Sequence, residues 1–146
     1  MKRRIDIEEH ILEFLYKWHR AIRIGDMIKE LKKEGLDIPH SSINSVIQRL
    51  EDDELVQWEK YSTVSLTEKG LKKVAHKLRH SHLLVMFLMK TLNLPHEIAL
   101  KESYSLSNAI SCDLIERINK ELEFPSKCYC NEFIPQIDNC MVKSYD

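Results

Sequence analysis

The hydrophobic positions in the first fifty residues recur at helical spacing and predict three amphipathic helices. The first covers residues 5–18, and the second covers residues 23–35, with Gly35 as its natural C-terminal stop. Ser41 or Ser42 can cap the third helix through a side-chain oxygen. The apolar face of this third helix comprises Ile43, Val46, Ile47 and Leu50.

Alternating apolar and polar positions follow the third helix and predict a small hairpin of two strands. Val56 and Trp58 precede a polar turn, and Val64 and Leu66 follow it. Three helices followed by such a hairpin have the element order of a winged helix–turn–helix, which is a DNA-binding fold. The N-terminal half of the chain is therefore predicted to adopt this fold.

A long helix is predicted after the hairpin, over residues 68–94, with Thr67 as its cap. It is polar at its start and densely apolar from Leu83 onward, as is typical of a helix that leads from a DNA-binding unit into a dimerisation unit. Two further helices fit residues 95–109 and 111–124. The remainder of the chain is expected to be irregular.

These elements predict a mostly α fold with two domains. A winged helix–turn–helix DNA-binding domain is expected at residues 1–75. A helical dimerisation and effector domain with an irregular, cysteine-containing tail is expected at residues 76–146. Only three glycines and four prolines occur among the 146 residues, which agrees with a largely helical chain.

Composition and charge narrow the class of protein. With 43% hydrophobic and 31% charged residues, the chain has the composition of a soluble globular protein. Its longest apolar run, Leu83–Met89, is too short to cross a bilayer, and no signal-peptide pattern opens the chain, so we expect a cytoplasmic protein without membrane contact. Residues 1–90 carry 17 Lys and Arg against 14 Asp and Glu, whereas residues 91–146 carry 5 against 9. Such a division suits a nucleic-acid-binding module joined to a partner-binding module.

The outward face of the predicted third helix carries small hydrogen-bonding side chains and ends in an arginine. Such a face suits a helix that reads base edges in the major groove and contacts nearby phosphates. The alternative is a solvated helix surface that only needed polar residues. The residues of this candidate DNA-reading face are Ser41, Ser42, Asn44, Ser45, Gln48 and Arg49.

Several segments in order resemble the diphtheria-toxin-repressor and manganese-regulator family of metal-dependent repressors: "EHILEFLYKW", "VQWEKYSTVSLTEKGLKKV", "HLLVMFL", "SCDLIERI" and "CYCNEFIP". The resemblance covers about residues 5–135 and is to the short members, which lack an SH3-like domain. It implies a homodimer that binds a palindromic operator in double-stranded DNA, with wing contacts near Lys60 and Tyr61. The connection "KELKKEGLDIPHSS" is several residues longer than in the family, so operator preference is not transferred.

The metal site implied by the resemblance is only partly present. His10 and Glu13 fall where the family has ligands on its first helix, and their i, i+3 spacing puts them on one helix face. The family's ligand position on the long helix falls on Ser81, and those on the next helix fall on Tyr104, Ser107 and Asn108. None of these four side chains is an ordinary ligand of first-row metals. The family site as usually built is therefore absent.

Three histidines lie on the predicted long helix near this position. His80 and His82 point about 200° apart at the helical period and cannot share one ion. His76 and His80 are four residues apart and could chelate, but they would need ligands from elsewhere. We interpret this stretch as a polar helix face and not as a metal site.

The cysteines offer a different route to a metal. Cys128 and Cys130 can present two thiolates from one loop, Cys140 could return to them, and Cys112 lies at a helix start, where backbone N–H groups favour thiolate. Together they could bind zinc or an iron–sulfur cluster. Free or redox-active thiols are the alternative, including a redox switch that changes the geometry of the dimer.

The sequence thus predicts a dimeric, sequence-specific DNA-binding transcription regulator with a diverged or lost divalent-metal site. Its cofactor could be a transition metal (iron, zinc or manganese) or an iron–sulfur cluster. Two alternatives are a ligand-independent DNA-binding protein and a protein-interaction module built on a winged helix. An enzyme is not expected, because the sequence contains no glycine-rich phosphate loop and no nucleophile elbow.

Overall fold

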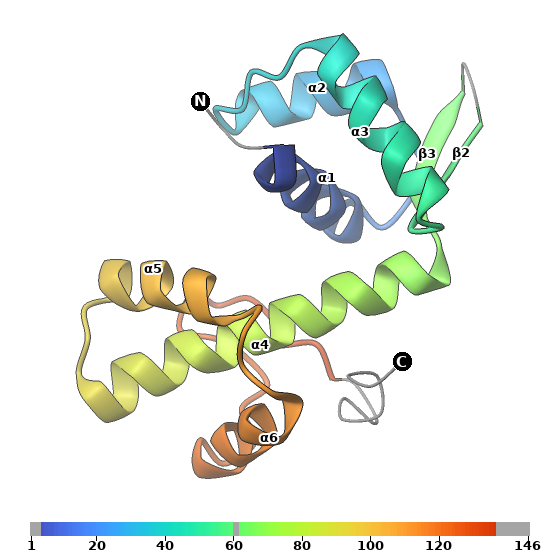
Figure 1. Cartoon of the computed structure of the whole chain (residues 1–146). Helices are drawn as coiled ribbons and strands as arrows, with labels where there is room; N and C mark the ends of the chain where they lie inside the picture. The colour runs from blue at the N-terminus through green and yellow to red at the C-terminus, as the bar shows by residue number, and fades with distance from the viewer. Residues whose placement is uncertain (1–3, 60–61, 137–146) are drawn as a thin grey trace. The chain divides into compact units, whose positions relative to one another are not determined.

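The computed structural model describes residues 4–59 and 62–136, and the chain divides into two compact units, Met1–Val74 and Ala75–Asp146. The elements of both units are labelled in Figure 1. Each unit has a hydrophobic core of its own. No helix in the described part of the chain is long and apolar enough to cross a membrane.

The first unit is a winged helix, as the sequence predicts. Its three short strands form one antiparallel sheet in the order β1-β3-β2, with Ile22 paired to Val64 and Val56 paired to Leu66. The two residues of β1 were not predicted, because so short a strand has no alternation to recognise. The elements are α1 (Arg4–Trp18), β1 (Ile22–Arg23), α2 (Ile24–Lys33), α3 (His40–Asp52), β2 (Val56–Trp58) and β3 (Thr63–Leu66).

The apolar face predicted for the third helix forms the centre of this unit. Ile43 and Ile47 have no exposed surface, and α3 packs on α1 and β2. Burying an aliphatic side chain of this size stabilises a fold by about 1.5–3 kcal/mol. The opposite face of α3 is thereby left towards solvent.

The start and stop signals of the first unit were predicted with mixed success. Gly35 follows α2 with a φ of +86°, in the left-handed region that a glycine adopts without strain, and its N–H bonds the carbonyl of Lys32. The prediction that Ser41 or Ser42 caps α3 is wrong. The helix begins earlier, with Pro39 at the cap position and no side-chain cap, because proline already has the backbone φ of a helix entry.

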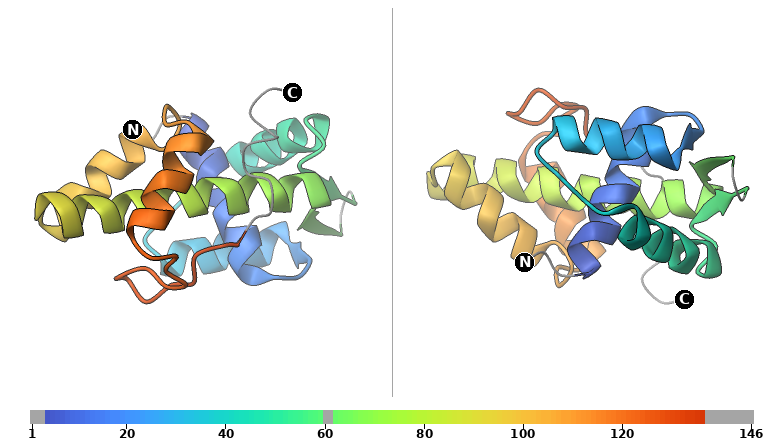
Figure 2. Two further views of the ribbon diagram at one scale, coloured as in Figure 1. Left: turned by 90° about the horizontal axis from the view of Figure 1, so that it is seen from below. Right: turned by 90° about the horizontal axis from the view of Figure 1, so that it is seen from above.

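The second unit consists of three helices and an ordered C-terminal hairpin. Its helices are the C-terminal part of α4 (Glu68–Leu92), together with α5 (His96–Leu106) and α6 (Cys112–Glu121). Figures 1 and 2 show α5 and α6 lying against the apolar part of α4. The core formed there contains Leu83, Leu84, Val85, Met86, Leu88, Ala99, Ile115, Ile118, Leu122, Cys128 and Ile134.

Two predicted helix boundaries of this region are confirmed by capping contacts. The Oγ1 of Thr67 accepts a hydrogen bond from the N–H of Gly70 at 3.0 Å, at the start of α4. The Oγ of Ser111 accepts from the N–H of Leu114 at 3.2 Å, which fixes Cys112 as the first residue of α6. The predicted positions of α5 and α6 are also confirmed.

The segment after α6 is more regular than predicted. Lys127 and Phe133 form an antiparallel bridge, and the N–H of Cys128 donates to the carbonyl of Glu132 at 2.9 Å. Asn131 has a φ of +68°, a conformation that asparagine tolerates, and closes the turn. Residues 126–134, called the cysteine hairpin below, thus hold two cysteines in a closed loop.

Candidate functional site

The candidate DNA-reading face lies on the surface of α3. Ser41 and Ser45 are exposed, and Ser42, Asn44 and Gln48 are half-buried. The hydroxyl and amide groups of this face can donate and accept hydrogen bonds, as the reading of base edges requires. The wing residues Lys60 and Tyr61, which the family resemblance implicates, lie outside the described residues.

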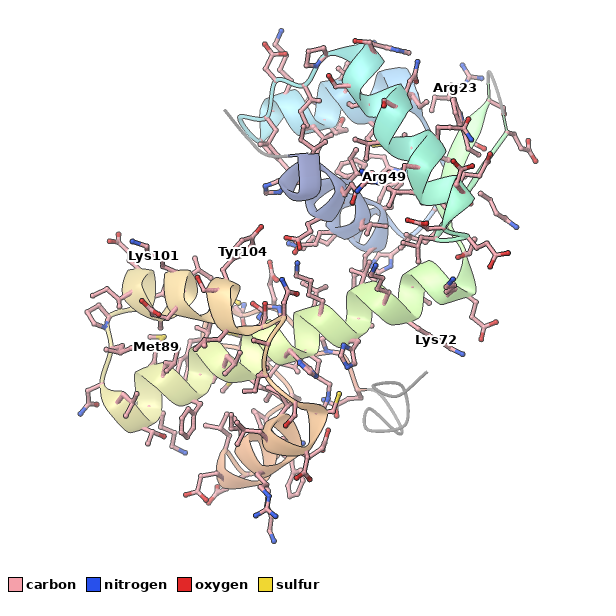
Figure 3. All side chains as sticks on the ribbon, viewed as in Figure 1. Arg23, Arg49, Lys72, Met89, Lys101 and Tyr104 are labelled. Carbon is pink, nitrogen blue, oxygen red and sulfur yellow. The ribbon has the colours of Figure 1, made fainter. Side chains whose placement is uncertain are left out.

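Arg49 has a structural partner in addition to its candidate role. Its Nη2 lies 2.6 Å from Oε1 of Glu8 on α1, and only 16% of the Glu8 side chain is exposed. Figure 3 shows Arg49 on the side of α3 that faces α1. The ion pair fixes the last turn of α3 against α1, so a substitution of Arg49 would disturb packing as well as any contact with phosphate.

A cleft of about 410 Å³ opens beside the first turn of α3. Arg23, His40 and Asn44 contribute to its polar lining, and the side-chain amide of Asn44 lies 3.1 Å from Nδ1 of His40. Figure 3 shows Arg23 beside the strands of the wing, where it is paired with Thr63 at the start of β3. Sequence reasoning missed both residues, because Arg23 lies before α2 and His40 lies before the predicted start of the third helix. They add a cation and an imidazole to the same face.

The family's metal ligands are not reassembled around the first helix. His10 and Glu13 are half-buried on α1, and no third His, Cys, Asp or Glu ligand joins them within the described part of the first unit. At the C-cap of α5, Ser107 is buried and donates to the carbonyl of Tyr104 at 3.2 Å. The ring of Tyr104 lies 5.5 Å from Nζ of Lys77, and the positive charge of this lysine would repel a metal ion at the same place. Tyr104 and Ser107, which stand at family positions, are thus engaged in other contacts of the second unit.

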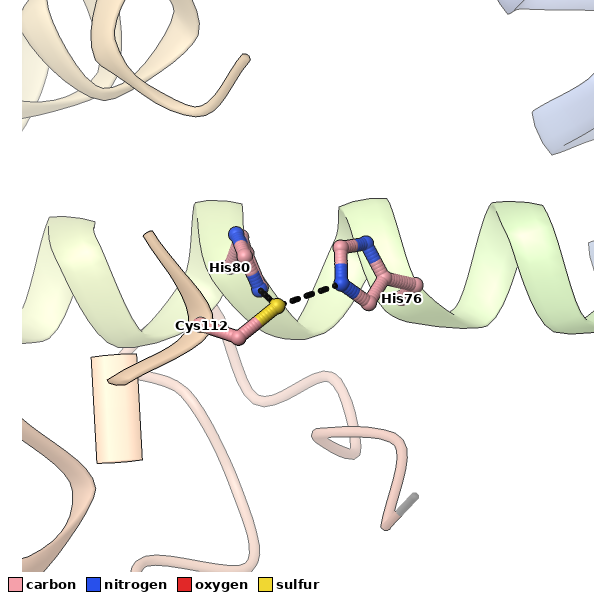
Figure 4. Close-up of side chains that lie close together, drawn as sticks. All are labelled: His76, His80 and Cys112. Carbon is pink, nitrogen blue, oxygen red and sulfur yellow. Dashed lines mark hydrogen bonds between the residues drawn. The ribbon is translucent and has the colours of Figure 1, made fainter. Parts of the chain in front are cut away.

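A different set of ligands meets within the second unit. His76 and His80 on α4 and Cys112 at the start of α6 are called the inner cluster. The Sγ of Cys112 lies 3.1 Å from Nε2 of His76 and 3.6 Å from Nε2 of His80. Figure 4 shows the sulfur facing both imidazoles. The ring centroids of the two histidines are 4.1 Å apart.

These distances suit a tetrahedral metal ion. Zinc–nitrogen bonds of about 2.0–2.1 Å and zinc–sulfur bonds of about 2.3 Å put neighbouring ligand atoms about 3.5 Å apart. The two helices fix the geometry, because the i, i+4 spacing puts His76 and His80 on one face of α4 and the cap at Ser111 fixes Cys112.

The surroundings keep His80 neutral. Burial, the neighbouring His76 and then Arg79 lower the pKa of His80 to about 4, and only 2% of the residue is exposed. A backbone hydrogen bond with Ser107 raises the pKa of His80. Because a bond that raises the pKa of a histidine favours its protonated form, the carbonyl of Ser107 accepts this bond from an imidazole N–H. A neutral imidazole that donates one N–H to a carbonyl offers its other nitrogen to a metal, as metal-bound histidines commonly do.

The interpretation of this stretch as a polar helix face is therefore corrected. His80 is buried, and Cys112, 32 residues further along the chain, supplies a third potential ligand. No spacing pattern signals this, because the cysteine is brought back by the turn between α5 and α6.

A second group forms on another side of α4. His82, Cys128 and Cys130, called the hairpin cluster, have ligand atoms within 4.8 Å of one another. Cys112 belongs to the other group, so the described cysteines are divided between two sites. Cys140, the fourth cysteine of the predicted thiolate site, lies outside the described residues.

Comparison with protein-family models gives one match for each half. Residues 67–136 match the model described as "Iron dependent repressor, metal binding and dimerisation domain". Residues 9–74 match the model of the ribonuclease R winged-helix domain. Both candidate clusters lie within the first of these matches.

Relatives in sequence are transcriptional regulators. An HTH-type transcriptional regulator of Methanocaldococcus jannaschii is 27% identical over 118 residues, which cover 81% of this chain and 90% of the relative. The HTH-type transcriptional regulator MntR of Geobacillus kaustophilus is 26% identical over 91 residues, which cover 62% of this chain and 64% of MntR.

Solved structures share the fold. The manganese regulator SloR is 23% identical with a TM-score of 0.69, and the match covers 88% of this chain and 59% of SloR. A hypothetical protein from Sulfolobus solfataricus is 20% identical with a TM-score of 0.68, and covers 93% of this chain and 100% of its own. The chain thus spans less than two thirds of the length of MntR and SloR.

Proposed function

We propose that this chain, which belongs to the diphtheria-toxin-repressor and manganese-regulator family, is a dimeric DNA-binding transcription regulator that binds a transition metal at its inner cluster. The observation that carries the proposal is the convergence of His76, His80 and Cys112 in the part of the chain that matches a metal-binding and dimerisation domain. The metal is proposed to replace the ion of the family site, whose ligand positions hold non-ligand residues.

DNA binding is proposed for the surface that α3 and the cleft beside it form. Ser45 and Asn44 offer groups for base edges, and Arg23 offers a cation for a phosphate. Ser41, Ser42 and Gln48 complete this surface, with wing contacts near Lys60 and Tyr61. Arg49 is assigned mainly to the packing of α3 on α1.

Dimerisation is proposed for the second unit. This unit exposes several large apolar side chains, which soluble proteins usually bury in an interface. A homodimer would present two copies of α3 to successive turns of a palindromic operator. The exposed apolar residues on its helices are Leu92, Ile98, Leu100, Leu106 and Leu114.

The donor set of the inner cluster favours a borderline or soft ion. Two imidazoles and one thiolate suit zinc, cobalt or ferrous iron, whereas manganese prefers carboxylate and carbonyl oxygens. Bound metal would hold α6 to α4 through Cys112. To regulate DNA binding, the metal must bind the DNA-competent conformation more tightly than the other one. This ligand set would make the effector different from the manganese named for SloR.

The DNA-binding part is tested by selecting genomic DNA fragments on the purified full chain at low salt. The selected fragment is then titrated with wild type, Asn44→Ala and Arg23→Ala. Lys120→Ala on α6 is the matched control, because it removes an exposed cation from the second unit. We expect Asn44→Ala to lose about tenfold in affinity and to relax base preference, since one good base contact contributes about 1–3 kcal/mol. Arg23→Ala should reduce the salt dependence by about one phosphate contact.

Failure to retain any DNA at low salt would overturn the DNA-binding proposal and favour a protein-interaction module. The metal-binding part is tested by the same titration on metal-free and zinc-loaded chain, for wild type and Cys112→Ser. We expect zinc to change the affinity of wild type for DNA by about 5–150-fold and not that of Cys112→Ser. Equal affinities with and without zinc in wild type would overturn metal control and identify a constitutive DNA-binding protein.

A further inference from the structure

We propose that His82, Cys128 and Cys130 form a second metal site, separate from the inner cluster, for a thiophilic divalent cation such as zinc. In this site the ion would join the cysteine hairpin to α4. The proposal stands on contacts within the second unit and depends neither on DNA binding nor on the inner cluster.

The cysteine hairpin holds its two thiols through backbone hydrogen bonds. The N–H of Cys128 donates to the carbonyl of Glu132, and the N–H of Asn131 donates to the carbonyl of Cys128, both at 2.9 Å. A third bond, from the N–H of Ile134 to the carbonyl of Ser126, closes the base of the hairpin. The spacing of the two sulfurs is thus set by a closed loop, which reduces the entropy that metal binding would otherwise lose.

His82 is oriented towards these sulfurs by a carboxylate. Its Nδ1 lies 3.8 Å from Sγ of Cys130, and its Nε2 lies 3.4 Å from Oε2 of Glu132. Metal-bound histidines commonly donate their second ring N–H to a carboxylate, which fixes the tautomer and makes the other nitrogen a better ligand. The pair of contacts on the two nitrogens of His82 has this arrangement.

A cation would stabilise the thiolate form of Cys128. Burial raises the pKa of Cys128 to about 11, and the side chain of Cys130 adds to this rise. Backbone N–H groups of Cys130 and Tyr129 act in the opposite direction, because they stabilise negative charge on the sulfur. A bound divalent ion would lower the pKa of Cys128 again, since a thiol that coordinates a metal ion is deprotonated.

The donor atoms of the hairpin cluster indicate the class of ion, and the exposure of its residues indicates how an ion would enter. Two sulfurs and one imidazole select zinc and related thiophilic ions over manganese or magnesium. Cys128 is buried in the core of the second unit, whereas Cys130 and Glu132 are exposed, so an ion can enter from solvent. Three protein ligands leave a fourth position, as in zinc sites that keep one open.

The hairpin cluster and the inner cluster cannot share one ion. His80 and His82 are two residues apart on α4, and their side chains therefore point about 200° apart. Cys112 accompanies His80, and Cys130 accompanies His82. The structure thus supports two separate ions.

The test uses the full chain purified without oxygen, stripped of metal and reloaded with zinc, followed by elemental analysis. Cys130→Ser and His82→Gln are the test variants, and His96→Gln, an exposed histidine, is the matched control. Cys112→Ser removes a ligand of the inner cluster and reports on that site separately. We expect Cys130→Ser and His82→Gln to lose about one zinc per chain relative to wild type, because each removes one of three ligands. His96→Gln should keep the zinc content of wild type. Cys112→Ser should lose the zinc of the inner cluster instead, and the double variant Cys112→Ser/Cys130→Ser should hold none.

Cobalt loading gives a second readout that identifies the ligands. Two of the three described thiols lie in the hairpin cluster, so Cys130→Ser should lose more of the thiolate-to-cobalt charge-transfer absorption than Cys112→Ser loses. Cys130→His should restore metal binding with weaker charge-transfer absorption, because imidazole replaces one thiolate. Glu132→Gln leaves all three ligands in place and should weaken zinc binding by about 10–100-fold, as expected for a partner of a ligand.

Zinc content equal to wild type in Cys130→Ser and His82→Gln would overturn the proposal. So would alkylation of Cys128 and Cys130 at rates that zinc does not change, or a disulfide between them that forms in the presence of zinc. If only the inner cluster fails to bind, Cys112→Ser will hold as much zinc as wild type while Cys130→Ser holds less. Failure of the proposed effector site is therefore distinguishable from failure of this one.

Discussion

The inner cluster and the hairpin cluster use histidines only two residues apart, yet their ligands and surroundings differ. The three side chains of the inner cluster all lie on helices, α4 and α6, and its His80 and Cys112 are 2% and 4% exposed. The hairpin cluster takes its two sulfurs from one short loop, and Cys130 is exposed. One helix thus serves two sites because its side chains project to opposite sides.

The difference concerns how each geometry is maintained. In the inner cluster, the packing of α6 on α4 sets the distances, so the ligands are held by the same core that stabilises the unit. In the hairpin cluster, backbone hydrogen bonds within residues 126–134 set the spacing of the sulfurs. A site held by helices can report on helix movement, whereas a site on a closed loop mainly stabilises that loop. If both proposed sites bind metal, we expect the inner cluster to be the one that affects DNA binding and the hairpin cluster to stabilise its loop.

Withdrawal of zinc should have the largest effect on stability and tests both clusters together. At zinc concentrations about 100-fold above the dissociation constant, each occupied site stabilises the folded chain by about 2.7 kcal/mol. For a unit of this size, each kcal/mol changes the melting temperature by about 4–8 °C. Calorimetry with and without a chelator measures the change. Cys112→Ser and Cys130→Ser should each retain about half of it, and coincident melting curves of wild type would contradict both sites.

Alkylation of the metal-free chain should distinguish the two hairpin thiols. A rise of the pKa from 9.0 to about 11 lowers the thiolate fraction of Cys128 by about 100-fold at neutral pH. We expect iodoacetamide to modify Cys128 much more slowly than the exposed Cys130, as followed by peptide mass spectrometry, because Cys128 is buried and little of it is thiolate. Equal rates in folded protein would mean that the hairpin does not bury Cys128.

Glu116→Gln should weaken the surroundings of the inner cluster and leave the hairpin cluster unchanged. Arg79, which is 4% exposed, has its Nη1 2.6 Å from Oε1 of Glu116. Removing the carboxylate charge that faces the buried Arg79 should lower the free energy of unfolding, measured in urea, by about 1–3 kcal/mol. Asp113→Asn is the control, because the Asp113–Arg117 pair is exposed and 3.9 Å apart, and it should change stability by less than about 1 kcal/mol. Equal losses in the two variants would refute the role of the buried pair.

Acidification should have the smallest effect and should act through His80 in the metal-free chain. Its pKa is lowered from 6.5 to about 4 in the folded state, so the unfolded chain binds more protons between these values. The contribution of His80 to the free energy of unfolding is therefore fully present above pH ~6.5 and is lost as the pH falls towards 4. Between pH 7 and 5.5 we expect a loss of about 1 kcal/mol in wild type, measured by urea unfolding. His80→Gln should lack this component, and an identical pH dependence in both proteins would argue against a buried neutral His80.

The local structure of this protein was determined by its sequence. Period-3.6 patterns located α1 to α6, alternation located the wing, and Thr67 marked the start of α4. The angular separation of His80 and His82 also followed from the helical repeat alone. Helices, strands and caps depend on residues that are close together in the chain, so the spacing of apolar and polar residues is enough to predict them.

Tertiary structure alone decided which ligands meet. Cys112 reaches His80 across 32 residues, and Cys130 reaches His82 across 48, through turns and core packing that no local pattern records. The strand β1 and the cysteine hairpin were missed for the same reason, since their hydrogen bonds need a partner segment before they stabilise anything. The sequence therefore determined where each potential ligand stands on its own element. Packing of α6 on α4 brought the inner cluster together, whereas the hydrogen bonds of residues 126–134 and their contact with α4 brought the hairpin cluster together.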